Sequence, residues 1–418
     1  MKQTFKNSLV AAGALLFAAS SAHAQDIKVG HLTYHTGEYG AWGDFFDGVA
    51  ELSFSVINET PPLGRAFVGI HQDIGTIGEA QAVRKLVDSE GVEILLNPAH
   101  SYLSYRDFVL EKIAESGHPI MPSVHGGSIE PQYGGTAAEP IFRASPMDSA
   151  QGNAALLHAQ AAGITSVAIL ATEVAGSQLQ KEAALLSAEA LGIEVVAAVD
   201  IQPGAPNYRS VVQRIGRENP QGVIIFSAPA DGGAIVKNAA EAGESWFIIG
   251  TSEWQETEFV DTATQGAIEQ HQDVVFAAFA PQEGPAFDWY KPMAEASPQA
   301  EAIGDVANSY ALQYYDVLIA TALAIEHAGT TEAEAWSASM YEVTGGEGQI
   351  VSTYAEGIEL LRAGEAINYD GVTGSMQYSP TGIVAGLYGI FEWKDGELSL
   401  VSTVDGDAVL ALEADIPS

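Results

Sequence analysis

The amino-acid sequence predicts an α/β protein of two lobes, each built on a doubly wound parallel sheet. Short apolar runs alternate with amphipathic segments of helix length, and this alternation occurs in two successive series. The chain has 418 residues, which is long for one hydrophobic core and suits two domains. The order of the segments and the length of the chain therefore agree on the fold class.

The first series lies in the amino-terminal third of the chain. Its predicted strands are 27–32, 66–70, 92–96 and 119–121, and its predicted helices are 40–57, 79–88 and 102–116. In the first helix, Trp42, Phe45, Phe46, Val49 and Leu52 recur at helical spacing and indicate one apolar face.

The second series begins near Asp148. Its predicted helices are 148–162, 177–191, 208–218 and 231–242, and its predicted strands are 166–171, 194–200, 222–227 and 246–250. Strands separated by helices form parallel sheets, and right-handed crossovers place helices on both faces of each sheet.

The amino terminus is typical of a secretion signal. Lys2 and Lys6 precede an apolar run from Leu9 to Ala18, which is too short to span a bilayer. Ala22-His23-Ala24 fits a cleavage site, so we expect residues 1–24 to be removed and the mature protein to reside in the periplasm. A retained membrane anchor is the alternative, but no positive charge directly follows the apolar run.

Charge and cysteine content exclude several classes of protein. The net charge is −37, so phosphates would be repelled and nucleic acid is not an expected partner. The chain has no cysteine, which excludes disulfides, thiolate metal sites, cysteine nucleophiles and a lipid-modified amino-terminal cysteine. The later apolar runs are short and resemble buried strands, so we expect a soluble mature protein.

The fold class predicts where a ligand binds. In open parallel sheets, ligands lie beyond the carboxyl ends of the strands, and two lobes that close on a hinge bury the ligand between them. The loops at these ends are 33–39, 97–101, 123–128, 172–176, 228–231 and 251–255. Tyr34, Glu173 and Asp231 are candidate ligand contacts in three of these loops.

Several motifs resemble one family in the expected order. They are Ala82-Val83-Arg84-Lys85-Leu86-Val87 with Gly91-Val92, Ile141-Phe142-Arg143-Ala144-Ser145-Pro146-Met147-Asp148, Tyr369-Asp370-Gly371-Val372-Thr373-Gly374, and Phe391-Glu392-Trp393-Lys394-Asp395-Gly396. Together they resemble the leucine/isoleucine/valine-binding proteins, which are type I periplasmic solute-binding components of branched-chain amino acid and amide ABC importers. The resemblance covers nearly all of the mature chain.

The resemblance implies a fold and a function. Three crossing strands would join lobe one, residues 26–146 plus 280–384, to lobe two, residues 147–279 plus 385–418. The protein would be a monomer that binds a small solute carrying a carboxylate, an amino acid or a related compound. It would then dock on ABC transporter permease subunits in the inner membrane. No catalysis and no cofactor are implied.

Ligand contacts also follow from the resemblance. In lobe one, the family grips the ligand carboxylate through a serine after the third strand, which matches Ser101, and through the loop of Ser123, Val124 and His125. In lobe two, Glu253 beside Trp254 matches the acid that holds the ligand ammonium. The alternatives are that these serines cap helices and form turns, that His125 is solvated, and that Glu253 is a surface glutamate.

One departure bears on the ligand. Members that bind amino acids commonly have Tyr-Gly in the loop after the first strand of lobe two, whereas this chain has Glu173-Val174-Ala175-Gly176. Aromatic residues stand elsewhere, at Tyr34, Tyr39, Trp42, Tyr102 and Trp254. Such a set favours stacking on an aromatic ring or enclosing a quaternary ammonium, so an aromatic carboxylate, an amide or a betaine is the alternative ligand. For Trp42, packing in the core is an equal alternative.

Two other protein classes compete with a transport function. An enzyme is disfavoured because the glycines after the first strand are spaced G-x-x-G-x-x-G, and no Walker A, G-x-S-x-G or H-E-x-x-H motif occurs. A ligand-sensing receptor domain would share the fold. His31 and His35 lie four residues apart, but one is in a strand and the other in a loop, so the sequence predicts no metal site.

Overall fold

The computed structural model describes residues 25–36, 40–98, 101–124, 129, 132–280, 284–384 and 386–413. The predicted signal peptide, Tyr39 and His125 lie outside the described residues.

The first sheet contains the strands of the first series. Parallel strands β2 (Phe67–Asp73), β1 (Ile27–Thr33) and β3 (Ile94–Leu96) lie in that order. Strand β4 (Met121–Ser123) pairs in parallel with β5 (Ile141–Arg143). Backbone hydrogen bonds from Leu95 N to Ile120 O and from Asn97 N to Pro122 O attach β4 to β3. A parallel sheet thus runs from β2 to β5.

Helices and a small sheet surround this first sheet. The helical segments are η1 (Gly40–Trp42), α1 (Gly43–Glu59), η2 (Pro62–Gly64), α2 (Ile74–Ile77), α3 (Glu79–Arg84), η3 (Lys85–Glu90), η4 (Tyr102–Ser104), α4 (Arg106–Ser116), α11 (Pro285–Glu295), α12 (Ala300–Ile303), α13 (Ser309–Ala328), α14 (Ala333–Gly345) and α15 (Tyr354–Ala363). The small sheet has the order β11 (Gln349–Val351), β12 (Ile367–Gly371), β13 (Gly374–Ser375). Helix α13 is buried along almost its whole length.

The second sheet contains the strands of the second series and extends beyond them. Within the described residues its order is β15 (Glu397–Val404), β14 (Tyr388–Lys394), β10 (Asp273–Phe279), β9 (Phe247–Gly250), β8 (Gly222–Phe226), β6 (Ser166–Thr172), β7 (Glu194–Ile201). Strands β6 to β10 are parallel, and β14 and β15 add antiparallel pairs at one edge. The helical segments here are α5 (Asp148–Ala161), α6 (Ala175–Leu191), α7 (Arg209–Glu218), α8 (Pro229–Glu241), η5 (Ser252–Gln255), α9 (Thr257–Ala263), α10 (Gln265–Ile268) and α16 (Gly406–Glu413).

These elements confirm the predicted fold class. Each strand and helix of the two predicted series is present, with ends displaced by a few residues. The helix predicted at 79–88 changes character at Lys85, where α3 gives way to the wider turn η3. Strands β5 and β10 belong to these sheets and are not among the predicted strands.

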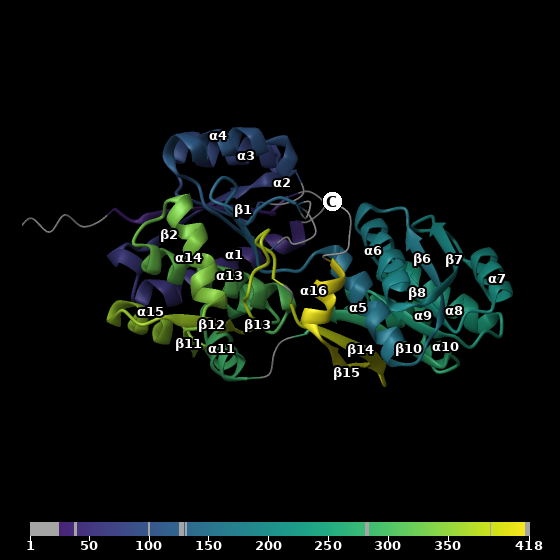
Figure 1. Cartoon of the computed structure of the whole chain (residues 1–418). Helices are drawn as coiled ribbons and strands as arrows, with labels where there is room; N and C mark the ends of the chain where they lie inside the picture. The colour runs from purple at the N-terminus through teal and green to yellow at the C-terminus, as the bar shows by residue number, and fades with distance from the viewer. Residues whose placement is uncertain are drawn as a thin grey trace, which may run out of the picture.

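Hydrophobic residues gather in separate cores around the two sheets. The core of the first sheet draws on residues 27–144 and 286–384, and the clusters on the two faces of the second sheet draw on residues 150–280 and 387–409. We call these parts lobe one and lobe two. Figure 1 shows them side by side, with the yellow β14, β15 and α16 joined to the teal lobe two.

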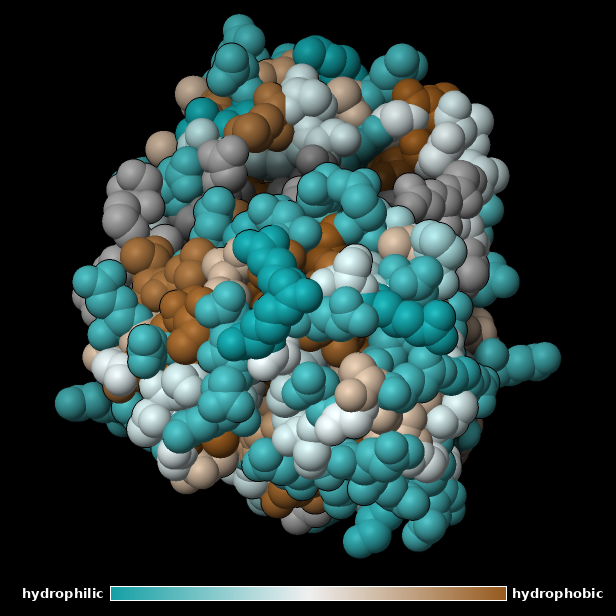
Figure 2. Space-filling view, turned by 90° about the vertical axis from the view of Figure 1, so that its right-hand side faces the viewer, coloured by the Kyte–Doolittle hydropathy of each residue, from teal (hydrophilic) through white to brown (hydrophobic). Residues whose placement is uncertain are grey.

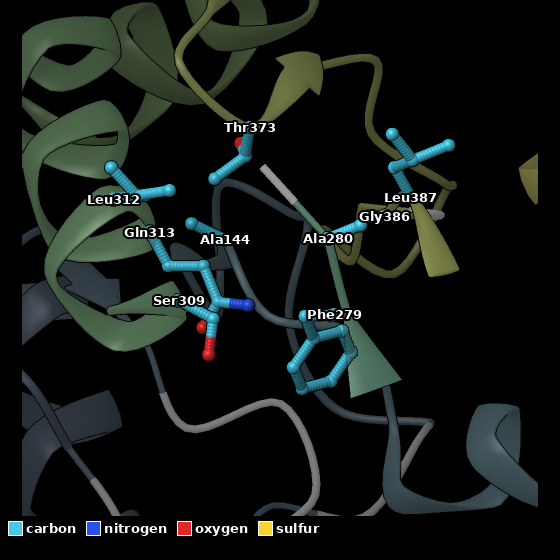
Figure 3. Close-up of a pocket in the computed structure, with 9 residues that line it drawn as sticks. All are labelled: Ala144, Phe279, Ala280, Ser309, Leu312, Gln313, Thr373, Gly386 and Leu387. Carbon is cyan, nitrogen blue, oxygen red and sulfur yellow. The ribbon is translucent and has the colours of Figure 1, made fainter. Parts of the chain in front are cut away.

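The chain passes between the lobes after β5, after β10 and before β14, and a small cavity lies at this crossing. Its lining residues are Ala144, Phe279, Ala280, Ser309, Leu312, Gln313, Thr373, Gly386 and Leu387 (Figure 3). Gln313 is 3% exposed, and its Oε1 has no hydrogen-bond partner among the described residues. A buried group of this kind is commonly satisfied by an ordered water.

The surface of lobe two is of mixed polarity. Figure 2 shows hydrophilic side chains over much of this face, with patches of hydrophobic side chains between them. Among the described residues, no helix combines the length and the apolar character that crossing a membrane requires.

Candidate functional site

Two carboxylates of lobe two lie where the lobes face each other. Asp148 is the first residue of α5, and Glu253 lies in η5, directly after the carboxyl end of β9. Burial, and to a smaller extent the negative charge of Glu253, raise the pKa of Asp148 to about 6. Within the described residues, no donor forms a hydrogen bond with the Asp148 carboxylate. In the described part of the chain, no Lys, Arg or His forms an ion pair with either carboxylate, so the negative charge of the pair has no cationic partner there.

The neighbouring residues fix the position of Glu253. Gln151, one turn after Asp148, accepts a hydrogen bond from Ser252 N at 3.1 Å. The indole of Trp254 is fully buried, stacks on Phe259 at 4.3 Å between ring centroids, and donates from Nε1 to Ser227 O. Glu253 itself is exposed. The buried tryptophan thus anchors the turn that presents the glutamate.

Glycines make room for this anchor. A Cβ atom at Gly232 would lie 2.4 Å from the Trp254 ring, and one at Gly250 would lie 2.2 Å from it. Trp393 Nε1 also donates to Trp254 O at 2.7 Å. Trp254 therefore has no exposed ring face in this conformation and serves to position the turn.

Tyr310 of lobe one feels the charge of both acids and contacts a second aromatic ring. Tyr310 lies in the first turn of α13, whose amino end is capped by the Asn308 side chain. Burial raises the pKa of the Tyr310 hydroxyl, and the charges of Glu253 and Asp148 raise it further, so the two acids lie within electrostatic range of this tyrosine. The ring of Trp42 meets Tyr310 edge-on at 5.8 Å between centroids.

Trp42 packs on the core of lobe one and keeps part of its surface exposed. It stacks on Phe46 at 5.7 Å, and Phe46 is part of the core of lobe one. It is also partly exposed and lines an open hollow together with Phe45, Asp305 and Asn308, among other residues. The core-packing alternative for Trp42 is thus observed, and its role as a ligand contact stays a prediction.

Other predicted residues of lobe two are occupied within that lobe. Asp231 is 7% exposed and accepts hydrogen bonds from Gly204 N at 2.9 Å and from the Tyr208 hydroxyl at 2.7 Å. Glu173 is exposed and accepts a hydrogen bond from Gln202 Nε2. The structure does not bring either residue into contact with the pair formed by Asp148 and Glu253.

In lobe one, the predicted carboxylate grip is only partly described. Ser123 is buried, and its Oγ donates to Pro98 O at 2.9 Å, while Val124 N lies 3.4 Å from Asn97 Oδ1. Ser101 is exposed, and its backbone N–H donates to Glu79 Oε2 at 2.9 Å. The Ser123 hydroxyl is therefore engaged in this conformation, whereas Ser101 stands at the surface.

Two predicted aromatic contacts are core residues here. Tyr102 is 1% exposed, and its hydroxyl donates to Glu139 Oε1 at 2.6 Å. Tyr34 is 4% exposed and packs against Phe46 at 5.9 Å between ring centroids. In this conformation both rings support the loops beside the site and offer it little surface.

Sequence reasoning missed Asp148 and Tyr310 as site residues. An acid in the first turn of a helix is common because it complements the helix dipole, so Asp148 carried no special signal. Tyr310 lies far from the assigned strand ends, at the start of a helix that looks like a core helix. Their role becomes visible only when the two lobes are placed face to face.

The periplasmic binding protein family model matches residues 26–396, and the chain belongs to this family. The predicted resemblance and the type I periplasmic binding fold are thereby confirmed. No curated protein matches the chain.

Solved structures are similar over most of the chain. The leucine-binding protein LivK of Thermotoga maritima is 16% identical, with a TM-score of 0.66 over 91% of this chain and 99% of that one. An R. palustris solute-binding protein in complex with benzoate is 16% identical, with a TM-score of 0.62 over 90% of this chain and 96% of that one. A fatty acid ABC transporter substrate-binding protein of Thermomonospora curvata is 14% identical, with a TM-score of 0.61 over 92% of this chain and 94% of that one.

At these identities the likeness shows the fold. The chain is a periplasmic binding protein of the ABC transporter type, and the printed ligands of its structural neighbours span several chemical classes.

Proposed function

We propose that this protein captures a small solute with a positively charged nitrogen, an amino acid or a related compound, in the cleft between its lobes. It delivers the solute to the permease subunits of an ABC importer in the inner membrane. The observation that carries the proposal is the pair formed by Asp148 and Glu253, whose charges repel each other and also act on Tyr310 of lobe one.

The charge of the site favours an ammonium group. Two carboxylates that repel each other are both stabilised when a cation comes between them, and hydrogen bonds to charged partners are the stronger kind. Glu253 corresponds to the acid that the family resemblance assigns to the ligand ammonium. LivK, one of the similar structures, is named a leucine-binding protein, and leucine carries such a group.

The ligand carboxylate would be held by lobe one. Ser101 is exposed, and Ser123 and Val124 directly precede His125 in the chain. Because the Ser123 hydroxyl donates to Pro98 O, we expect ligand binding to use backbone N–H groups of this loop or to change the rotamer of Ser123.

Binding proceeds by hinge closure, without chemistry. The ligand first meets one lobe, and closure adds contacts from the other, because the closed form has the higher affinity. The separate hydrophobic cores support hinge segments near 146, 280 and 385, which correspond to the predicted lobe bounds. The protein acts as a monomer in the periplasm after cleavage at Ala24, and it has no enzymatic role.

A betaine is the second candidate ligand. The edge-on pair of Trp42 and Tyr310 beside two acids suits a quaternary ammonium, which is attracted both by aromatic rings and by carboxylates. The two candidates differ in that a primary ammonium donates hydrogen bonds to the acids and a quaternary one does not.

A thermal-shift panel tests the proposal. The mature protein is unfolded and refolded to remove carried-over ligand, and is then heated with aliphatic amino acids, betaines, amides and aromatic carboxylates. A ligand that binds only the folded state at about 100 times its Kd adds roughly 2.7 kcal/mol of stability. We expect stabilisation by amino acids or betaines; stabilisation by aromatic carboxylates alone would contradict the cationic ligand.

The variant Glu253→Gln sharpens this test. It removes one negative charge at constant size, so it should weaken an amine-bearing ligand strongly, by about tenfold to 100-fold, and a plain aromatic carboxylate little. Glu256→Gln, three residues further along and also exposed, is the matched control. Equal losses for both ligand classes in isothermal titration would disprove the assignment of Glu253.

A further inference from the structure

A second cluster of chemically active side chains lies inside lobe one. The parallel register of β1 and β2 pairs His31 directly with His71, so the two imidazoles project from the same face of the sheet. Helix α1 crosses this face and presents Asp47 and Glu51, one turn apart, to the two rings. Three separate elements thus bring their polar side chains to one point.

Three donor atoms of this cluster form a nearly equilateral triangle. His31 Nδ1 lies 3.0 Å from His71 Nδ1 and 3.2 Å from Asp47 Oδ1, and His71 Nδ1 lies 2.9 Å from the same oxygen. A tetrahedral zinc ion with bonds of about 2.0–2.1 Å spaces its ligand atoms about 3.3 Å apart. If the three ligand atoms moved apart by a few tenths of an ångström, they could therefore coordinate one ion together.

The outer atoms of the same residues have the partners that metal ligands require. His71 Nε2 lies 3.0 Å from Glu51 Oε1, and His31 Nε2 is hydrogen-bonded to the Tyr314 hydroxyl. The second oxygen of Asp47 lies 2.7 Å from His35 Nε2. In metal sites, a ligating histidine usually gives its other N–H to a carboxylate or another acceptor, which fixes the ring and its tautomer.

We propose that His31, His71 and Asp47 bind a divalent transition-metal ion, with Zn²⁺ the best fit. Two imidazoles and one carboxylate suit zinc and its neighbours, whereas Mg²⁺ and Ca²⁺ prefer oxygen ligands alone. Water completes a tetrahedral set at the fourth position. The site is separate from the pair of Asp148 and Glu253 and depends on none of its residues.

The burial of the cluster provides both rigidity and access. His31 is fully buried, which fixes one ligand, while the side chains of His71 and Asp47 are 27% and 25% exposed. His35 and Asp44 lie at the open side, where His35 Nδ1 is 3.6 Å from Asp44 Oδ1. An ion would enter past these two residues and would tie β1, β2 and α1 together.

The sequence alone predicts no metal site in this part of the chain. The spacing of His31 and His35 indicates that these two residues form no metal pair. The histidine that lies beside His31 is His71, 40 residues further along the chain. Neither the spacing nor any short motif marks such a pair, because only the strand register brings the residues together.

Titration of metal ions into the untagged, chelator-treated mature protein tests the proposal. We expect one Zn²⁺ to bind per chain in isothermal titration calorimetry with excess Mg²⁺ present, which occupies weak acidic surface sites. His71→Gln and Asp47→Asn should each weaken binding by at least 100-fold, and Glu51→Gln, which alters only the outer partner, by about tenfold. His327→Gln, a partly exposed histidine bonded to Ser339, is the matched control and should bind as the parent does.

A spectroscopic probe separates coordination from loss of folding. Co²⁺ in a four-coordinate site gives visible absorption bands, which should appear in the parent and in His327→Gln and be absent in Asp47→Asn. Circular dichroism confirms that each variant is folded. If Zn²⁺ does not bind stoichiometrically to the parent, or binds equally to the folded Asp47→Asn variant, the cluster is a hydrogen-bond network only and the proposal is overturned.

Discussion

Asp148 is partly buried and Asp316 is fully buried, and the pKa of each carboxyl group is raised. The two acids differ in their hydrogen-bond partners. Burial is the main cause that raises the pKa of each to about 6. Asp316, in the middle of α13, accepts hydrogen bonds from the Tyr369 hydroxyl, Val372 N, Thr373 N and Thr373 Oγ1. Asp148 has no such donor among the described residues, and its second influence is the negative charge of Glu253.

The difference shows that a raised pKa does not by itself identify a binding residue. Asp316 is an internal anchor, because its acceptor positions are taken by the turn after β12. The glycine at position 371 leaves room for this carboxylate, because a Cβ atom there would lie 2.4 Å from Asp316 Oδ1. Asp148 keeps its acceptor capacity and sits beside a like charge, an arrangement that becomes favourable when a cation arrives. We expect stability to depend on the first acid and ligand affinity on the second.

Asp316→Asn should have the largest effect. The new amide keeps one oxygen for Tyr369 and Val372, but its NH₂ group would face the donors of Thr373. Buried donors left without acceptors cost about 1–3 kcal/mol each, so we expect a loss of about 2–4 kcal/mol in the free energy of unfolding. Urea unfolding followed by circular dichroism measures it.

The matched control is Asp288→Asn, an exposed aspartate in the same lobe, which should leave the free energy of unfolding unchanged. Ligand affinity of the folded Asp316→Asn protein should equal that of the parent. If stability is retained and affinity is lost, the roles assigned to the two acids are wrong.

The sequence predicts the fold well because the fold is determined by local periodicity. The two series of strands and helices follow from apolar spacing, and Glu253 is placed correctly at the carboxyl end of its strand. Trp254, Tyr102 and Asp231 lie in or beside the correct loops, but the sequence does not reveal which way a loop side chain points. The structure places these three residues inside, where they support the loops.

Residues that act across long separations in the chain are the ones the sequence does not predict. Tyr310 comes within electrostatic range of Asp148 and Glu253 only through the arrangement of the two lobes, and His31 meets His71 only through the register of β1 and β2. Neither relation leaves a pattern in one sequence. The predicted contact at His125 lies outside the described residues and stays a prediction, and Tyr39 of the aromatic set lies outside them as well.

Asp148→Asn should have an intermediate effect on a different quantity. The charge-assisted contact with the ligand cation is lost, so affinity for an amine-bearing ligand should fall by about 100-fold, which corresponds to about 2.7 kcal/mol. The free energy of unfolding should stay constant or rise, because repulsion by Glu253 disappears. Isothermal titration and urea unfolding measure the two quantities on the same sample.

Asp261→Asn, an exposed position in the same lobe, is the control for Asp148→Asn. A variant that unfolds more easily than the parent and binds the ligand as well as the parent would make Asp148 a structural acid like Asp316. The assignment of Asp148 to ligand binding and of Asp316 to stability would then be wrong.

A change of pH should alter ligand affinity less than the substitutions do. It distinguishes Asp148 from Asp316 most clearly, because only Asp148 is expected to contact the ligand. The pKa of Asp148 in the ligand-free folded protein is about 6, above its ordinary value of 3.8, so the folded protein holds this proton more tightly than the unfolded chain does. Lowering the pH through 6 therefore stabilises the folded protein relative to pH 7. The same protonation removes the charge that an ammonium ligand needs.

Affinity for a ligand that stays cationic should accordingly fall by about tenfold between pH 7.5 and pH 5, where roughly one Asp148 in ten is ionised. Asp148→Asn should bind weakly and nearly equally at both pH values. Asp316 titrates in the same range but lies away from the ligand, so the folded Asp316→Asn variant should retain the parent's slope. If the slope survives in Asp148→Asn and vanishes in Asp316→Asn, the proton that opposes the ligand belongs to the internal anchor, and ligand binding is coupled to the interior of lobe one.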